Sequence, residues 1–111
     1  MKISLKETEA FDGGEFKGNL YVQKKDGKGF NALLVDCLTG HYKTLLKDAT
    51  RVYFVFEGSG TFTINDKEMP VEQYDLFLIR SGDTYSYKGT MKLFEFNVPA
   101  TDEGNEEKLG E

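Results

Sequence analysis

Arg51 and several tyrosines are the residues of this sequence whose types and spacing suit ligand chemistry. Arg51 begins the most apolar run of the chain, and alternation along a strand places Arg51, Tyr53 and Val55 on one face. Tyr85 and Tyr87 share one face of a later run. Together with Tyr53 they could line a cavity for a sugar or an aromatic ligand, and plain core filling is the alternative for each ring.

His41 is the single histidine, and it follows a predicted chain break at Thr39-Gly40. It could act as a general base, or it could bind a metal together with Asp36 and Cys37. One histidine and one cysteine offer few soft ligands for zinc. The competing interpretation is a solvated loop histidine without a chemical role.

The elements that must position these residues are short strands. Brief apolar runs alternate with Gly, Asp and Asn, and no stretch keeps a helical period. Many short strands with regular turn signals are typical of an all-β sandwich or barrel. We expect strands at residues 20–25, 30–38, 42–47, 51–57, 61–64, 68–71, 74–79, 85–88 and 92–98.

The chain is long enough for one domain with one core, which we expect over residues 1–99. From residue 100 to residue 111 the sequence is acidic and contains glycine, with Leu109 as the only strongly hydrophobic residue after Ala100. That composition predicts a loose, flexible C-terminal tail.

Charge and cysteine content exclude several classes of function. The net charge is −5, which argues against nucleic acid and anionic membrane partners, because both need clustered Lys and Arg. Cys37 is the single cysteine, so an internal disulfide is ruled out, and a reducing compartment such as the cytoplasm is expected. No apolar leader follows Met1, and no apolar run approaches the length of a membrane span.

Two segments resemble the conserved motifs of the cupin superfamily. Residues 51–65 resemble the first motif, with Arg51 at its Glu position and Gly58 at its Gly position. Residues 74–85 resemble the second motif, with its spacing kept and Tyr85 at its His position. The resemblance covers roughly residues 30–99. It implies an all-β, single-domain, cupin-type jelly-roll β-barrel.

The metal ligands implied by that resemblance are missing. The His-x-His pair of such proteins falls around residues 45–48, where no histidine is present. Arg51 replaces the glutamate ligand, and Tyr85 replaces the third histidine. A fixed guanidinium charge repels a divalent cation. We therefore expect neither a metal nor any other cofactor.

In the cupin layout the Arg51 face looks into the barrel. A buried guanidinium must be paired or must await an anion. One hypothesis for Arg51 is an internal ion pair with Glu95 or another acid. The other is recognition of a carboxylate or a phosphate by its planar fork. Lys47, which we expect near the same open end of the barrel, is either a ligand contact or a solvated side chain.

These residues predict a metal-independent protein that binds a small polar or anionic molecule, of the sugar or carboxylate class. The expected ligand-binding residues are Lys47, Arg51, Tyr53, Tyr85 and Tyr87. One alternative is a metal-independent sugar isomerase or epimerase, with His41 or Glu95 as base and Tyr85 or Tyr53 as acid. A second alternative is a non-catalytic structural dimer whose barrel is filled by its own aromatic side chains.

The opposite face of the Arg51 strand predicts a partner. Val52, Phe54 and Phe56 point away from the barrel interior in the cupin layout, and an exposed aromatic row is unusual on a monomer. A homodimer through this face is the natural explanation, and homodimers are common among cupins. A second packed sheet or a covering segment from the same chain is the alternative.

Overall fold

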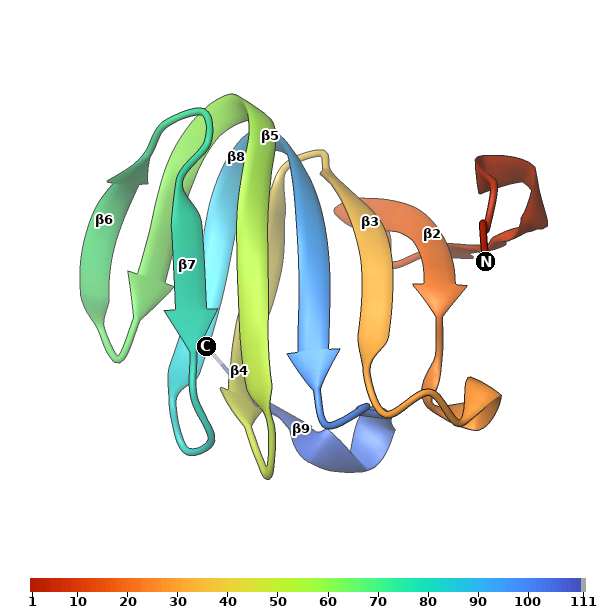
Figure 1. Cartoon of the computed structure of the whole chain (residues 1–111). Coiled ribbons are helices and arrows are strands. Elements are labelled where there is room, and N and C mark those ends of the chain that lie inside the picture. The colour runs from red at the N-terminus through yellow and green to blue at the C-terminus, as the bar shows by residue number, and fades with distance from the viewer. Residues whose placement is uncertain (111) are drawn as a thin grey trace.

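The computed structural model describes residues 1–110, and it is built almost entirely from antiparallel strands (Figure 1). Three short 3-10 turns interrupt the strands: η1 (Leu5–Glu7), η2 (Lys24–Asp26) and η3 (Glu103–Asn105). The strands are β1 (Glu9–Asp12), β2 (Phe16–Val22), β3 (Asn31–Cys37), β4 (Gly40–Leu46), β5 (Thr50–Ile64), β6 (Lys67–Val71), β7 (Leu76–Ile79), β8 (Thr84–Val98) and β9 (Glu106–Lys108).

Two long strands, β5 and β8, form the spine of the barrel and pair with each other along their whole length. Both bend where glycines face each other, with Gly60 opposite Gly89. Gly58 has a φ of +101°, and a Cβ there would lie 2.1 Å from the Thr90 carbonyl oxygen. Only glycine allows the two backbones to approach this closely. Each strand therefore bends at this point and continues, instead of ending there.

The bend lets one continuous sheet curl around a single core. The second half of β8 pairs with β3, which is followed outward by β2 and β1. The first half of β8 pairs with β4, which is followed by β9. β6 and β7 flank the two halves of β5. The predicted all-β barrel is confirmed, and Figure 1 shows the curl of the sheet.

Alternation along β5 sorts its side chains as the sequence predicts. Arg51, Tyr53 and Val55 face the interior and are 2%, 1% and 0% exposed. Stacked rings fill the far end of the interior, where the centroids of Phe62 and Phe77 lie 4.2 Å apart.

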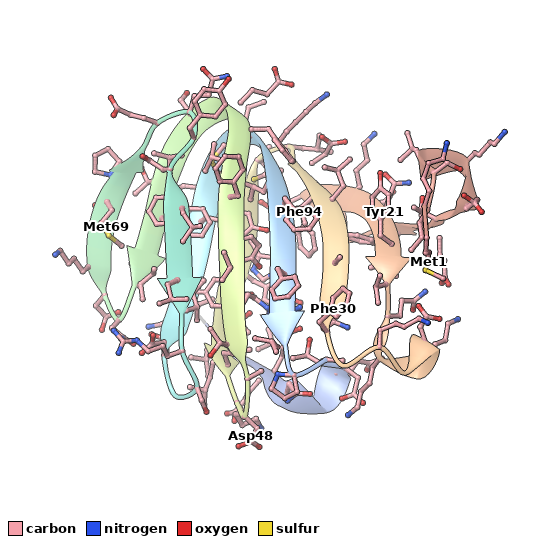
Figure 2. The ribbon with its side chains drawn as sticks, viewed as in Figure 1. Met1, Tyr21, Phe30, Asp48, Met69 and Phe94 are labelled. Carbon is pink, nitrogen blue, oxygen red and sulfur yellow. The ribbon has the colours of Figure 1, made fainter. Side chains whose placement is uncertain are left out.

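The outer face of β5, β7 and β8 is apolar. Val52 lies opposite Leu78 and Phe96, while Phe54 lies opposite Leu76 and Phe94. Figure 2 shows Phe94 on the side of β8 that faces away from the interior. Several side chains on or beside this face are well exposed, among them Phe56, Leu76, Leu78 and Val98.

The C-terminal segment, for which the sequence predicts a loose tail, contains a short 3-10 turn and a short strand. Residues 101–108 turn back over one end of the barrel, and β9 pairs with β4 through Thr44–Lys108 and Leu46–Glu106. Thr101 is buried, and its backbone and hydroxyl groups both donate to the Asn31 side chain. The acidic composition is misleading because part of its charge is neutralised inside the barrel. Glu111, the last residue of the expected tail, lies outside the described residues.

None of the helical segments within residues 1–110 is long and apolar enough to cross a membrane.

Candidate functional site

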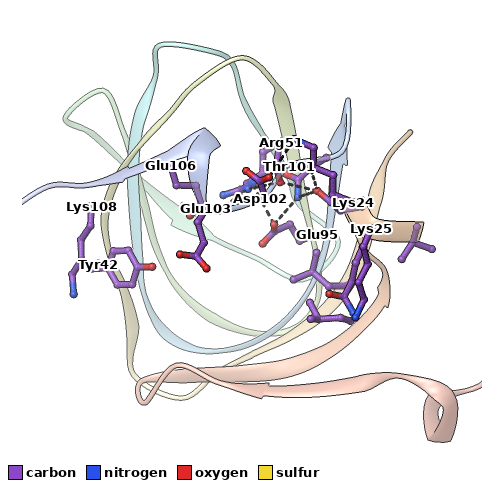
Figure 3. A pocket seen from close by; sticks show the side chains of 16 residues that line it. Lys24, Lys25, Tyr42, Arg51, Glu95, Thr101, Asp102, Glu103, Glu106 and Lys108 are labelled. Atoms are coloured by element: carbon purple, nitrogen blue, oxygen red, sulfur yellow. Dashed lines mark hydrogen bonds and ion pairs between the residues drawn. The ribbon is translucent and has the colours of Figure 1, made fainter. Parts of the chain in front are cut away.

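A cavity of about 830 Å³ opens at the end of the barrel that the C-terminal segment covers (Figure 3). Its walls include Leu20 and Val22 of β2 on one side and Tyr42 of β4 on the other. Its polar floor comes from β5 and β8, with Arg51, Glu95 and Asn97, and from the adjoining Asn31 and Thr101.

Arg51 is held at this floor by side chains from β8. Its Nε atom donates to Asn97 Oδ1 at 2.5 Å and lies 3.2 Å from Glu95 Oε2. Its Nη1 atom donates to the Tyr85 hydroxyl at 2.8 Å. The internal ion pair with Glu95, one of the two hypotheses for this arginine, is therefore present.

The C-terminal segment supplies a second carboxylate for the same guanidinium. The Nη2 atom of Arg51 lies 3.1 Å from Glu106 Oε2, and it also donates to Thr101 Oγ1 at 3.3 Å. Burial alone would lower the pKa of Arg51, but the Glu95 carboxylate and its other neighbours raise that pKa well above its ordinary value. Arg51 is therefore a permanent cation shared by two anions.

The three predicted tyrosines form a buried layer beside Arg51. The Tyr53 and Tyr85 hydroxyls lie 3.1 Å apart, and the Tyr87 ring packs against Tyr53 with centroids 5.3 Å apart. All three are almost fully buried, and burial raises the pKa of each phenol. They therefore stay protonated at neutral pH. None of them is among the residues that line the cavity.

His41 lies in β4 among aromatic rings, not in the solvated loop of the competing interpretation. Its ring stacks on Tyr87 with centroids 5.0 Å apart, and it packs at a tilt against Phe16 with centroids 4.5 Å apart. The Tyr42 carbonyl, 2.7 Å from Nδ1, can only accept, so Nδ1 carries the hydrogen and Nε2 keeps its lone pair. Burial lowers the pKa of His41, although Glu95 and Glu106 act in the opposite direction. His41 is thus a neutral base at pH 7.

Lys47 is not among the residues that line the cavity. Its Nζ atom lies 3.8 Å from Glu107 Oε1 in an exposed pair, and its backbone amide donates to the Asn105 carbonyl.

Sequence reasoning missed Glu106 and Thr101, because the acidic tail carried no signal of burial. It also missed Tyr42, although an aromatic residue beside the single histidine was a usable signal.

The residues present do not fit the metal that the cupin fold often holds. Arg51 occupies the expected glutamate position and is bonded to carboxylates, so a divalent cation there would meet a fixed positive charge. Across residues 1–110, no three His, Cys, Asp or Glu side chains converge as a ligand set. Cys37 is buried, and burial raises the pKa of its thiol to about 11. That thiol is therefore neither a ready ligand nor a nucleophile.

No family model matches the sequence. No curated protein matches it either. Solved structures do match. Pac13 from Streptomyces, a nucleoside dehydratase, is 22% identical and has a TM-score of 0.88 over 98% of this chain and 90% of its own. Pac13 variants with a histidine or a tyrosine replaced also match, each with uridine.

Two further solved structures extend the comparison to other proteins. Ectoine synthase from P. lautus is 15% identical and has a TM-score of 0.81 over 99% of this chain and 90% of its own. The cupin domain of Schizosaccharomyces pombe Cnp3 is 18% identical and has a TM-score of 0.72 over 89% of this chain and 72% of its own. At these identities the likeness concerns the fold, and this chain has the fold of the cupin superfamily.

Proposed function

We propose that this protein binds a small hydroxyl-bearing molecule of the nucleoside or sugar class in the barrel cavity, without a metal. The observation that carries the proposal is the cavity of about 830 Å³ with its floor of Arg51, Glu95 and Asn97. Small-molecule sites typically measure roughly 300–1,000 Å³ and hold a few fixed polar groups. The uridine in the Pac13 variants, whose fold matches over 98% of this chain, supports the nucleoside class.

The geometry favours the polar ligand of the sequence-based hypothesis over the anionic one. Recognition of a carboxylate or phosphate by the planar fork needs two free N–H groups side by side, yet four of the five N–H groups of Arg51 already donate to side chains. Of the predicted ligand-binding residues, Arg51 lines the cavity. Tyr53, Tyr85 and Tyr87 support the floor from behind, and we assign them to positioning.

Proton transfer by His41 is the second candidate function, favoured by the Nε2 lone pair of a neutral imidazole. His41 is not among the residues that line the cavity, and it lies next to Tyr42, which is. A base that takes a proton from a carbon beside a carbonyl group can start an isomerisation or the loss of water. In the second case the departing hydroxide takes up a proton and leaves as water. The imidazolium that this step forms on His41 can return the proton to that hydroxide. This chemistry covers both the isomerase alternative and a dehydratase reaction.

One experiment separates these functions from a filled, non-catalytic barrel. Thermal shift and calorimetry with nucleosides, aldoses and ketoses test binding, and a barrel without ligand capacity gives no response to any of them. Proton NMR in D₂O then tests catalysis, because a base that removes a carbon-bound proton exchanges it for deuterium. His41→Gln should keep binding but abolish exchange. Exchange that persists in this variant would remove His41 from the proposal.

We also propose that the outer face of β5, β7 and β8 joins two copies of the chain. The support is the set of exposed apolar side chains at and beside the predicted Val52, Phe54 and Phe56 row, including Leu76 and Leu78. A contiguous apolar face of this kind is more typical of an interface than of a free surface. The lone buried thiol of Cys37 is compatible with the expected cytoplasmic location.

A further inference from the structure

Glu95 uses only one of its two carboxylate oxygens within residues 1–110. Its Oε2 atom accepts a hydrogen bond from Asn97 Nδ2 at 2.9 Å and lies 3.2 Å from Arg51 Nε. No hydrogen bond or ion pair in the described part of the chain uses Oε1. The Glu95 side chain is nevertheless only 10% exposed.

The free oxygen faces the cavity. Glu95 lines that cavity, and no fully enclosed side-chain oxygen or nitrogen in residues 1–110 lacks a hydrogen-bond partner. Oε1 must therefore be reachable from the open space. Figure 3 shows the Glu95 carboxylate at the edge of the open centre of the barrel. Because two neighbours hold the other oxygen, Oε2, the carboxylate is fixed in place and presents Oε1 as a preorganised acceptor.

The surrounding charges select the kind of group that this acceptor can meet. Arg51 is shared between Glu95 and Glu106, and Glu103 adds a further carboxylate to the lining without an ion pair in the described residues. An anionic group placed beside Oε1 would meet uncompensated negative charge.

The lysines of the lining are already engaged. Lys24 pairs with Asp102 at 3.3 Å, and Lys25 pairs with Glu9 at 3.6 Å, both on the exposed rim. The Lys108 ammonium lies 4.5 Å from the centroid of the Tyr42 ring. No lysine of the described chain therefore pairs with Glu95.

We infer that Glu95 Oε1 accepts a hydrogen bond from a hydroxyl of the bound molecule, and that it makes the site prefer hydroxyl-bearing ligands over their carboxylate counterparts. This inference rests on the proposed function and names the residue that sets its ligand class. Hydroxyl donors satisfy a buried carboxylate by a charge-assisted hydrogen bond, whereas a carboxylate ligand has no hydrogen to give at neutral pH.

Glu95→Gln is a sharp test because the neighbours dictate how the amide must lie. Arg51 Nε and Asn97 Nδ2 are both donors, so they hold the amide oxygen where Oε2 now lies. The amide NH₂ group then faces the cavity. The substitution therefore removes the charge and turns the acceptor into a donor, while Glu106 still neutralises Arg51.

The experiment measures calorimetric affinities for three matched pairs: uridine and uridine 5′-carboxylate, glucose and glucuronate, ribose and ribonate. The wild type should prefer the neutral member of any pair that it binds. In Glu95→Gln that preference should shrink roughly ten- to hundredfold, the range expected for a hydrogen bond to a charged group. Glu57→Gln is the matched control, because it removes the same charge from an exposed pair with Lys92. It should leave every ratio unchanged.

The outcomes separate this inference from the proposed function. If the wild type binds neutral compounds and Glu95→Gln keeps the same preference, Glu95 is not the selector, although the ligand class stands. If the wild type binds only the carboxylates, or binds none of the six compounds, both are overturned. If Glu95→Gln fails to fold, Glu95→Asp is the second variant. It keeps the negative charge but moves the carboxylate oxygen away from the cavity, because its side chain is shorter. It should weaken binding of neutral ligands while keeping the preference, and unchanged affinity would refute the contact.

Discussion

The Nε atom of Arg51 and the Oε2 atom of Glu95 lie 3.2 Å apart inside the barrel, with side chains that are 2% and 10% exposed. Because both side chains are largely buried, water compensates only in part when either partner is lost. The pair joins the beginning of β5 to the second half of β8, two strands that also pair through their backbones, so the charge balance of the site is set where these strands meet.

Arg51→Leu should therefore destabilise the protein, since it leaves Glu95 buried without its cation. Removing one partner of a buried pair costs about 3–5 kcal/mol. Urea unfolding followed by circular dichroism measures the loss. Lys92→Leu, which breaks the exposed pair with Glu57, is the control and should cost at most ~1 kcal/mol. If Arg51→Leu loses no more than the control, the ion pair is not what holds the floor together.

Glu106→Gln tests whether the C-terminal segment belongs to the structure of the site. Its carboxylate bonds Arg51 Nη2 at 3.1 Å and is 30% exposed. The substitution should lower the free energy of unfolding by about 1–2 kcal/mol, less than for a fully buried charged partner. The neighbouring Glu107→Gln is matched in sequence and charge but breaks only the exposed pair with Lys47. Equal effects of the two substitutions would contradict a structural role for Glu106.

The pKa of His41 should lie below its ordinary value of 6.5, because burial disfavours the imidazolium. Glu95, Glu106 and the backbone carbonyl of Tyr42 favour protonation, while Arg51 opposes it, and burial dominates. The sequence contains one histidine, so a single set of imidazole signals in an NMR titration reports this pKa directly. A measured value of 6.5 or higher would rule out the neutral base.

The same shift sets the sign of a pH effect on stability. Between the lowered folded pKa and 6.5, the unfolded chain binds more protons than the folded chain. The contribution of His41 is therefore fully present above pH 6.5 and is lost as the pH falls through the folded pKa. Comparing the pH dependence of unfolding in the wild type and in His41→Gln isolates this contribution. The wild type alone should weaken across that window.

Leu78→Asp should convert the proposed homodimer into a monomer, because it buries a carboxylate in the outer apolar face. Light scattering should give about twice the 12.6 kDa chain mass for the wild type and the single chain mass for the variant. Leu38→Asp is the matched control, since Leu38 is 44% exposed and Leu78 is 46% exposed, but it lies in the turn between β3 and β4. A wild-type monomer at all concentrations would remove the interface.

Metal analysis of protein purified without added metal should find well under one equivalent of any transition metal. The reason is the donor set, in which the Arg51 guanidinium stands at the expected glutamate position and is bonded to the two carboxylates beside it. Stoichiometric iron, manganese, nickel or zinc that resists chelators would contradict this expectation.

The fold and the orientation of Arg51 could be predicted because they depend on local rules. Alternation along β5 fixes which side chains face inward, and the glycine pattern marks the turns and bends. The same rules made Gly58-Ser59-Gly60 and the region of Gly89 look like strand ends. The structure has continuous bent strands there. Glycine has no Cβ, so the two backbones can approach closely at these positions while the hydrogen bonds between the strands continue.

The rest of the site depends on contacts that no local pattern reports. Asn31 and Thr101 are 70 positions apart, and Arg51 and Glu106 are 55 positions apart. The acidic C-terminal segment looks solvated in the sequence, because nothing local shows that the buried Arg51 cation lies beside it in the fold. Likewise, His41 looked like a loop residue because Gly40 precedes it. Gly40 is in fact the first residue of β4, and its lack of a side chain leaves room for the Tyr87 carbonyl oxygen.

The central position of β8 bears on how the barrel is made. β8 pairs with β3, β4 and β5, none of which adjoins it in the sequence, so few of its contacts can form before distant parts of the chain meet. All-β topologies of this kind fold on the order of milliseconds to seconds, far more slowly than helical bundles. During that time the apolar face of β5 and β7 is open to other unfinished chains. Low temperature and low expression rate should therefore raise the yield of native protein, with aggregation as the competing fate.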